Sequence, residues 1–177
     1  GLPISVIFTK CDQMAGFTAF FCDLSMDERN QYCGIRLPLG QTATTMKKTI
    51  NKHLMQLNKR FHDRLLSRLQ NEISAGQRSS MHDFPYQFEL FCTRSIHFLN
   101  ELLPDCDLNL TGLFFTSSQQ SGPSINHLTA QLSEVFSLQR QPQFEMYTQQ
   151  SPYFITELCQ HLLPSFAENA TAFLQPR

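Results

Sequence analysis

The stretch Leu2–Asp12, which reads Leu-Pro-Ile-Ser-Val-Ile-Phe-Thr-Lys-Cys-Asp, decides the fold of this chain. Its near-continuous apolar run from Ile4 to Phe8 predicts a strand that is buried on both faces, as parallel strands usually are. A second run of this kind is Leu110–Thr116. Because helical patterns fill much of the remaining chain, we predict a helix-dominated α/β fold with two parallel strands.

The residues directly after the first predicted strand are Thr9-Lys10-Cys11-Asp12. A strand that delivers [Asn/Thr]-Lys-x-Asp into a loop is typical of domains that bind guanine nucleotides. The aspartate accepts two hydrogen bonds from the guanine ring that adenine does not offer, and the lysine stem packs along the base. Thr9, Lys10 and Asp12 are therefore candidate base-binding residues. A surface lysine and aspartate after a strand remain the alternative interpretation.

A GTPase also needs a phosphate-binding loop, G-x-x-x-x-G-K-[ST], whose backbone N–H groups and lysine hold the phosphates. None of the seven glycines in this chain is followed by lysine. We therefore expect that the chain by itself neither binds a nucleotide tightly nor hydrolyses one. The expected position of a phosphate loop, and of further strands, is upstream of Gly1 in a larger protein.

Composition limits the remaining functions. The 177 residues fit one domain, and 16 phenylalanines without a tryptophan predict a Phe-rich core. A net charge of −1 gives no reason to expect nucleic acid as a partner. No apolar run reaches the roughly 18 residues of a membrane-spanning helix, so we expect a soluble segment. Six cysteines without a C-x-x-C pair predict free thiols rather than a metal site.

A long amphipathic helix is predicted from about Thr44 to Ile73, because apolar residues recur there at every third or fourth position. Seven of the 14 cationic residues lie on its other faces: Lys47, Lys48, Lys52, Lys59, Arg60, Arg64 and Arg68. These cations are candidates for binding anionic lipid headgroups or an acidic partner protein. The solvated face of a packed helix is the alternative interpretation.

Shorter elements are predicted around this helix. Phe17–Leu24 has helical spacing, Ser25 and Glu28 form a capping box, and Gly34–Gly40 is predicted to be a loop. A second long helix is predicted to begin at Asp83–Pro85.

After the second strand, a helix at 125–136, a Gln/Pro-rich linker at 139–150 and a helix opened by Ser151-Pro152 are predicted. No catalytic constellation emerges along the chain, so no catalytic residue is assigned.

Several motifs in a fixed order resemble the IcmF/TssM family of bacterial inner-membrane secretion proteins, which serve type VI and type IVB (Icm/Dot) secretion systems. The residues that carry the resemblance are Leu2-Pro3-Ile4, Thr9-Lys10-Cys11-Asp12, Met14, Gly16-Phe17, Phe20-Phe21, Asp27-Glu28-Arg29, Gln31, Gly34, Arg68–Glu72, Phe84–Phe88, Gly112–Ser117 and Ser151–Phe154. They span essentially the whole chain, which makes the resemblance far more specific than the Thr-Lys-x-Asp motif alone.

The resemblance implies a GTPase-like sheet whose last two strands are separated by a helical-bundle insertion at about residues 13–107. Residues 1–138 are then the C-terminal part of a GTPase-like domain, 139–150 a linker, and 151–177 the start of a following helical region. By the same resemblance, Ser117 and Ser118 occupy the loop that backs the base in GTPases.

The resemblance also implies a parent protein anchored in the inner membrane, with this segment on its cytoplasmic face. The expected role is a scaffold and docking module that supports assembly of the secretion apparatus with a smaller membrane protein of the DotU/TssL type. The alternative is a GTP-binding switch whose phosphate loop lies upstream. We expect no cofactor for this chain alone, with GTP as the candidate cofactor of the intact parent, and whether that parent is an NTPase stays open.

Overall fold

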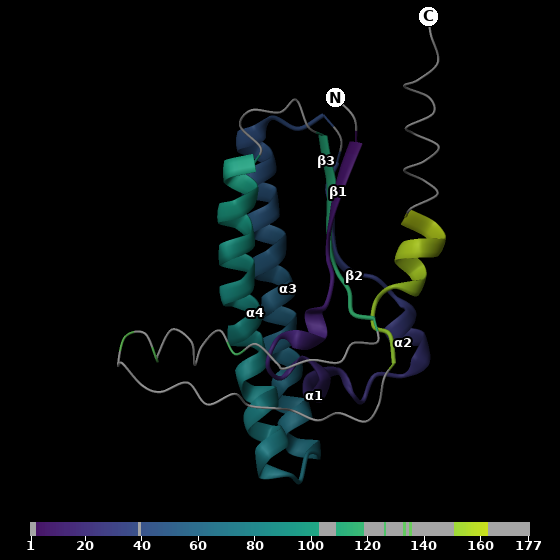
Figure 1. The fold of residues 1–177 in the computed structure, drawn as a ribbon, viewed down its shortest axis with the longest axis vertical. Coiled ribbons are helices and arrows are strands. Elements are labelled where there is room, and N and C mark those ends of the chain that lie inside the picture. The colour runs from purple at the N-terminus through teal and green to yellow at the C-terminus, as the bar shows by residue number, and fades with distance from the viewer. Residues whose placement is uncertain are drawn as a thin grey trace, which may run out of the picture.

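The computed structural model describes residues 3–38, 40–102, 109–118, 126, 133, 135 and 151–162. Its elements are β1 (Pro3–Phe8), the 3₁₀ turn η1 (Cys11–Gln13), α1 (Phe17–Phe21), α2 (Met26–Asn30), β2 (Cys33–Arg36), α3 (Ala43–Asn71), α4 (Ala75–Leu102), β3 (Asn109–Phe115) and the π-helical turn η2 (Leu158–Leu162). A small sheet stands beside the long α3–α4 hairpin, with α1 and α2 near one end of the sheet (Figure 1). The fold is therefore helix-dominated α/β.

The sheet has three strands in the order β1-β3-β2. β1 and β3 are parallel, as predicted, but β2 pairs antiparallel with β3, so the prediction of a sheet of two parallel strands was wrong. β2 was missed because it has only four residues, one of them glycine, and lies partly in the predicted loop Gly34–Gly40. A Cβ at Gly34 would lie 2.3 Å from the backbone oxygen of Leu113, so glycine is what allows β2 to approach β3.

The predicted long helix is confirmed as α3, which buries one stripe of residues: Met46, Ile50, Leu54, Phe61 and Leu65. α4 begins at Ala75, earlier than the predicted start at Asp83, and contains Pro85 in its interior. A proline inside a helix costs roughly 3 kcal/mol. Burial of the helix through Met81, Phe84 and Phe88 offsets this cost, since all three side chains are almost fully enclosed.

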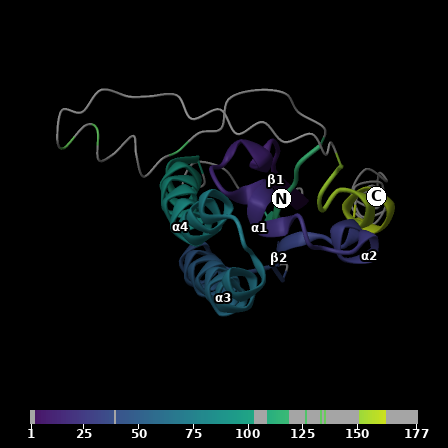
Figure 2. The same ribbon diagram turned by 90° about the horizontal axis from the view of Figure 1, so that it is seen from below.

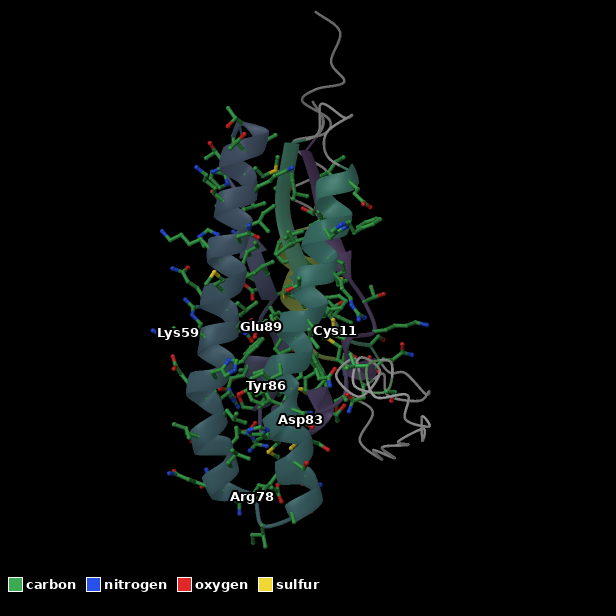
Figure 3. The ribbon with its side chains drawn as sticks, turned by 90° about the vertical axis from the view of Figure 1, so that its left-hand side faces the viewer. Cys11, Lys59, Arg78, Asp83, Tyr86 and Glu89 are labelled. Atoms are coloured by element: carbon green, nitrogen blue, oxygen red, sulfur yellow. The ribbon has the colours of Figure 1, made fainter. Side chains whose placement is uncertain are left out.

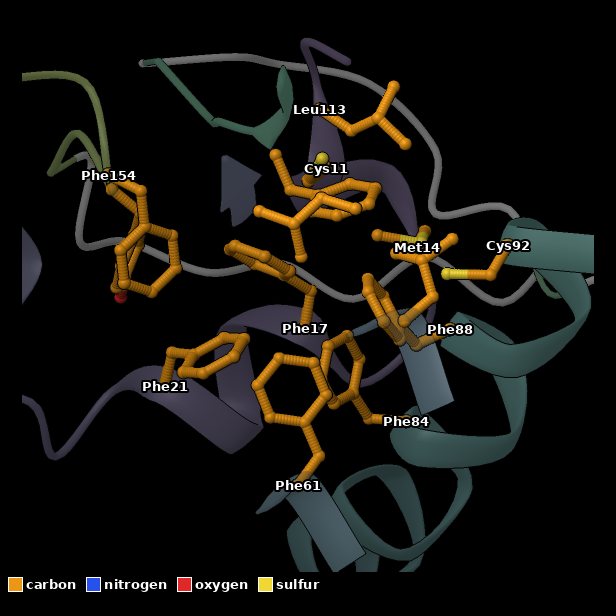
Figure 4. Packing of buried hydrophobic residues seen from close by; sticks show 14 of the residues in the cluster. Cys11, Met14, Phe17, Phe21, Phe61, Phe84, Phe88, Cys92, Leu113 and Phe154 are labelled. Carbon is orange, nitrogen blue, oxygen red and sulfur yellow. The ribbon is translucent and has the colours of Figure 1, made fainter. Parts of the chain in front are cut away.

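A cluster of phenylalanine rings forms the centre of the core, as the composition predicted (Figure 4). The ring of Phe84 on α4 lies 4.9 Å from Phe20 and 5.2 Å from Phe21 on α1, and 5.5 Å from Phe61 on α3. The predicted helix after Gly16 and the capping box of Ser25 and Glu28 are both present. This one cluster thus joins the hairpin to the elements that carry the sheet.

Gly16 sets how closely α1 approaches α4. Its φ is +81°, and a Cβ there would lie 2.0 Å from the backbone oxygen of Ser80 on α4. Any larger residue would separate the two helices or strain the turn that precedes α1.

Residues 151–162 return to the sheet. Tyr153 and Ser117 exchange two backbone hydrogen bonds, of 2.8 and 3.0 Å, and both Tyr153 and Phe154 are buried in the core. The helix predicted to open at Ser151-Pro152 begins instead at Thr156. The predicted linker at 139–150 lies outside the described residues, as does nearly all of the predicted helix at 125–136. Among the described residues, no helix combines the length and the apolar character that crossing a membrane requires.

Candidate functional site

The parallel pair brings the ends of β1 and β3 to the same edge of the sheet. Phe8 lies opposite Phe115, so the chain leaves both strands at the same level. The backbone N–H of Thr116 donates to the Phe8 oxygen at 2.8 Å, and that of Cys11 donates to the Thr116 oxygen at 3.1 Å. These bonds hold the loops Thr9–Asp12 and Thr116–Ser118 side by side.

Asp12 and Ser117 meet within this pair of loops. The Ser117 hydroxyl donates to Oδ1 of Asp12. The backbone N–H and the backbone oxygen of Ser117 are both hydrogen-bonded to the backbone of Tyr153. Ser117 is buried, whereas Asp12 is only partly so. The structure therefore brings together two of the predicted base-binding residues, and the Asp12 carboxylate is held in place just beyond the ends of β1 and β3. That they bind guanine stays a prediction.

The other candidates at this edge are exposed. Thr9, Lys10 and Ser118 lie at the surface. Lys10 has a φ of 60° and a ψ of 34°, in the left-handed region that non-glycine residues rarely occupy. Such a residue costs of order 1–3 kcal/mol and persists because its surroundings fix it. The loop thus presents the Lys10 side chain from a constrained backbone.

Cysteines near this edge are inert. Burial raises the pKa of Cys11 to about 12 and that of Cys92 to about 12, and it raises the pKa of Cys33 well above the usual range. These thiols are protonated at neutral pH, so none is a nucleophile. The described cysteines are free thiols, as predicted, and within the described ranges no group of His, Cys, Asp or Glu side chains is placed to hold a metal ion.

The seven cations of the predicted surface differ in exposure, according to the face of α3 on which each lies. Lys48, Lys52, Lys59 and Arg60 are exposed, while Lys47 and Arg64 are half-buried. Seen from the end, α3 lies at the outer edge of the molecule, and Lys59 points away from α4 (Figures 2 and 3). Within the described part of the chain, none of the four exposed cations has a carboxylate within ion-pair distance.

Arg68 does not belong to that surface, and the prediction that it does was wrong. Its guanidinium donates to the backbone oxygens of Phe20 at 3.2 Å and Ala19 at 3.0 Å, and it pairs with Asp23 at 3.1 Å. Arg64 shares the same aspartate at 2.8 Å. The sequence contained the signal, because Arg68 continues the buried stripe three residues after Leu65.

Two exposed apolar side chains on the outer face of α3 were missed by sequence reasoning: Met55 is 74% exposed and Leu66 69%. Together with the lysines they form a single row, which we call the outer stripe of α3: Lys48, Lys52, Met55, Lys59 and Leu66. Their spacings of three, four and seven residues place them on one side of a helix, opposite the core. Ile73, predicted to end the helix, is 97% exposed and lies beyond the end of α3 at Asn71.

Comparison with known proteins agrees with the resemblance found in the sequence. The chain matches the family model of the IcmF-related N-terminal domain over residues 1–176. It is 30% identical over 181 aligned positions to the type VI secretion system component TssM1 of Pseudomonas aeruginosa, covering 99% of this chain but 16% of that relative. No solved structure matches it. The chain therefore belongs to the IcmF/TssM family and carries its IcmF-related N-terminal domain.

Proposed function

We propose that this chain is a scaffold and docking module of an IcmF/TssM-like secretion-system protein, and that α3 docks an acidic partner protein. The observation that carries the proposal is the outer stripe of α3, where exposed lysines are interleaved with the exposed apolar side chains of Met55 and Leu66. Isolated exposed apolar residues are ordinary, but a row of them interleaved with cations is typical of surfaces that bind proteins.

The stripe is presented by a rigid element. The opposite face of α3 packs into the core through Phe61 and Leu65, and Arg68 ties the C-terminal part of the helix to the backbone of α1. A preformed surface loses less conformational entropy on binding than a flexible one, so more of the contact energy contributes to affinity.

The chemistry of the stripe indicates what it binds. On binding, Met55 and Leu66 would bury apolar surface, at about 25 cal/mol per Å², and the lysines favour carboxylates and speed association. Asp63 is also exposed on this side of α3, which favours a protein, whose carboxylates can be placed around it, over a uniformly anionic membrane surface. By family, we propose a DotU/TssL-type inner-membrane protein as the partner, with the parent membrane-anchored and this segment on the cytoplasmic face.

Charge reversal on the stripe tests this proposal. In the parent's cytoplasmic region, Lys48→Glu, Lys52→Glu and Lys59→Glu together should lower co-purification of the DotU/TssL-type partner at least about tenfold. Arg78→Glu, an exposed cation near the turn between α3 and α4, is the matched control and should change nothing. Unchanged co-purification of the triple variant removes the basis for the proposal, and selective loss of binding to anionic vesicles would assign the stripe to the membrane instead.

A nucleotide switch is a second candidate, favoured by the contact between Ser117 and Asp12 at the ends of two adjacent parallel strands. It requires a phosphate loop elsewhere in the parent, and GTP is the candidate ligand. Titration of a fluorescent GTP analogue into the parent's cytoplasmic region tests it. Saturable binding that Asp12→Ala abolishes supports the switch, and absence of binding in both proteins refutes it.

A further inference from the structure

The two long helices meet along an outer face that is partly aromatic. The rings of His62 on α3 and Tyr86 on α4 pack edge to face, with centroids 5.3 Å apart. Met55 lies seven residues before His62 and Leu66 four residues after it, so both continue its row on α3. Tyr86 and Glu89 lie on the side of α4 that faces α3 (Figure 3). We call these five residues the hairpin face: Met55, His62, Leu66, Tyr86 and Glu89.

The centre of the hairpin face is held in place before any partner binds. Nδ1 of His62 donates to the backbone oxygen of Asn58 at 3.0 Å, which fixes the imidazole ring against Tyr86. The ring of His82 approaches Tyr86 from within α4, with centroids 5.7 Å apart. Tyr86 is nonetheless 42% exposed. An aromatic side chain that its neighbours fix and that stays open to solvent is the kind that contributes most to binding energy.

The backbone of the hairpin favours a helix over a strand as the element that covers this face. Backbone N–H and carbonyl groups in a helix interior are bonded within the helix, so an added strand would find no row of them to pair with. A helix satisfies its own backbone and can lay one row of side chains between the rows of α3 and α4. From Met55 to Leu66 the row on α3 rises by about 16 Å, so about three turns of a partner helix would cover it.

The two sides of the hairpin face carry opposite charges. Lys52 and Lys59 are exposed on its α3 side, and Glu89 is exposed on its α4 side. Within the described part of the chain, none of the three has an opposite charge within ion-pair distance. Glu89 is approached by the amide of Asn58, at 3.5 Å. A helix with carboxylates along one edge and a cation on the other complements all three charges.

We propose that the hairpin face binds an amphipathic helix of the partner protein, whose apolar side chains pack against Tyr86. The edge of this helix over α3 carries carboxylates, and its edge over α4 carries a cation opposite Glu89. The inference rests on the proposed docking function. It adds the kind of element that docks, the charge of each edge and Tyr86 as the residue on which the helix is anchored.

Glu89→Lys separates this inference from docking of a partner that is simply acidic. In the parent's cytoplasmic region, we expect it to raise the dissociation constant for the DotU/TssL-type partner about tenfold, because two like charges then face each other. A simply acidic partner would bind the added lysine more tightly. Glu101→Lys, the same change at an exposed position near the end of α4, should leave binding unchanged. Biolayer interferometry measures all three proteins.

Tyr86→Ser tests the aromatic anchor. It should raise the dissociation constant at least about tenfold, while the urea midpoint stays nearly the same because the side chain is not part of the core. Phe98→Ser, at an exposed aromatic position outside the hairpin face on the same helix, is the matched control and should not weaken binding. Equal weakening by both variants would contradict a specific role of Tyr86.

Photo-crosslinking identifies the element that binds. Benzoylphenylalanine is placed at position 55 or at position 66, and mass spectrometry finds the partner residue that each one labels. If a helix lies along α3, the two labelled residues are about 11 positions apart, at a rise of about 1.5 Å per residue. A strand, with a rise of about 3.3 Å, would place them about five positions apart and would overturn the inference.

The outcomes also separate this inference from the proposal on which it rests. Wild-type affinity in both Glu89→Lys and Tyr86→Ser, or tighter binding by Glu89→Lys, overturns the oppositely edged helix. The docking proposal survives that result if reversal of Lys48, Lys52 and Lys59 still removes binding. If the triple reversal also leaves binding intact, both the docking proposal and this inference fail.

Discussion

The strand ends and the outer stripe of α3 use polar side chains in opposite ways. At the strand ends, polar groups pair within the chain: the Asp12 side chain with that of Ser117, and the backbone N–H of Cys11 with the backbone oxygen of Thr116. On the outer stripe, the cations have no carboxylate partner in the described part of the chain. The strand ends are thus built as a structural joint, while the stripe leaves its charges available to another molecule.

Arg68 and Lys59 show the same contrast on a single helix. Arg68 points inward and binds two backbone oxygens and Asp23, whereas Lys59 points outward into solvent. Residue type alone therefore does not assign a cation to a binding surface. The face of the helix on which the cation lies does assign it, and the position of the buried apolar stripe shows which face is which.

The largest expected effect comes from removing a ring of the phenylalanine cluster that joins the α3–α4 hairpin to the rest of the fold. Phe84→Ala removes the ring that contacts α1 and α3 and should lower the free energy of unfolding by about 3–5 kcal/mol. Tyr86→Ala, an exposed aromatic two residues along α4, should cost less than about 1 kcal/mol. Urea denaturation measures both, and equal losses would mean that the core does not centre on Phe84.

Arg68→Met sharpens the contrast between inward and outward cations. It leaves the backbone oxygens of α1 without their donor and should cost about 2 kcal/mol, with Asp23 still paired to Arg64. Lys59→Met should stay within about 0.5 kcal/mol. Thermal denaturation of the two variants makes the comparison, and a neutral Arg68→Met would contradict its structural role.

At the strand ends, Ser117→Ala removes the hydrogen bond to Asp12 and should cost about 1 kcal/mol. Ser118→Ala, at the exposed neighbouring position, should have almost no effect. Chemical denaturation of both variants tests whether the joint depends on this side-chain contact. If Ser118→Ala proves the more destabilising, the contact is not what holds the loops.

The smallest effect concerns the capping box of α2. Hydrogen bonds from the backbone and side chain of Ser25 lower the pKa of Glu28. Since the folded pKa is below the unfolded one, this contribution to stability is present above the unfolded pKa and is lost as the pH falls through the folded pKa. Ser25→Ala removes the side-chain hydrogen bond but keeps the backbone one, so an NMR titration should show the Glu28 pKa rising only part of the way toward its usual value. An unchanged pKa would assign the shift to the backbone hydrogen bond alone.

The elements that sequence predicted best are those with long, regular patterns. β1, β3 and α3 followed from apolar runs and from a helical repeat that continues over many turns. β2 and the first two turns of α4 did not, because both depend on partners distant in sequence: β2 on β3, and Ala75–His82 on the contact of α4 with Gly16. Local propensity carries little information about such contacts.

The candidate site was predictable only in part. The meeting of Asp12 with Ser117 follows from two parallel strands that end together, so it was available from sequence. The exposure of Ile73 was not, because that residue fits the helical repeat of the sequence but α3 ends at Asn71, two residues before it. A cavity lined by Lys10, Phe91 and Phe98 was also out of reach, since α4 supplies one wall from more than 80 residues away.

Site-specific photo-crosslinking tests the docking account most directly. A benzoylphenylalanine at position 59, in the middle of the outer stripe, is compared with the same group at position 78 in cells that contain the assembled secretion apparatus. The account predicts a cross-link from position 59 to the DotU/TssL-type partner and none from position 78. Equal cross-linking from both positions, or none from position 59 while the partner still co-purifies, would contradict it.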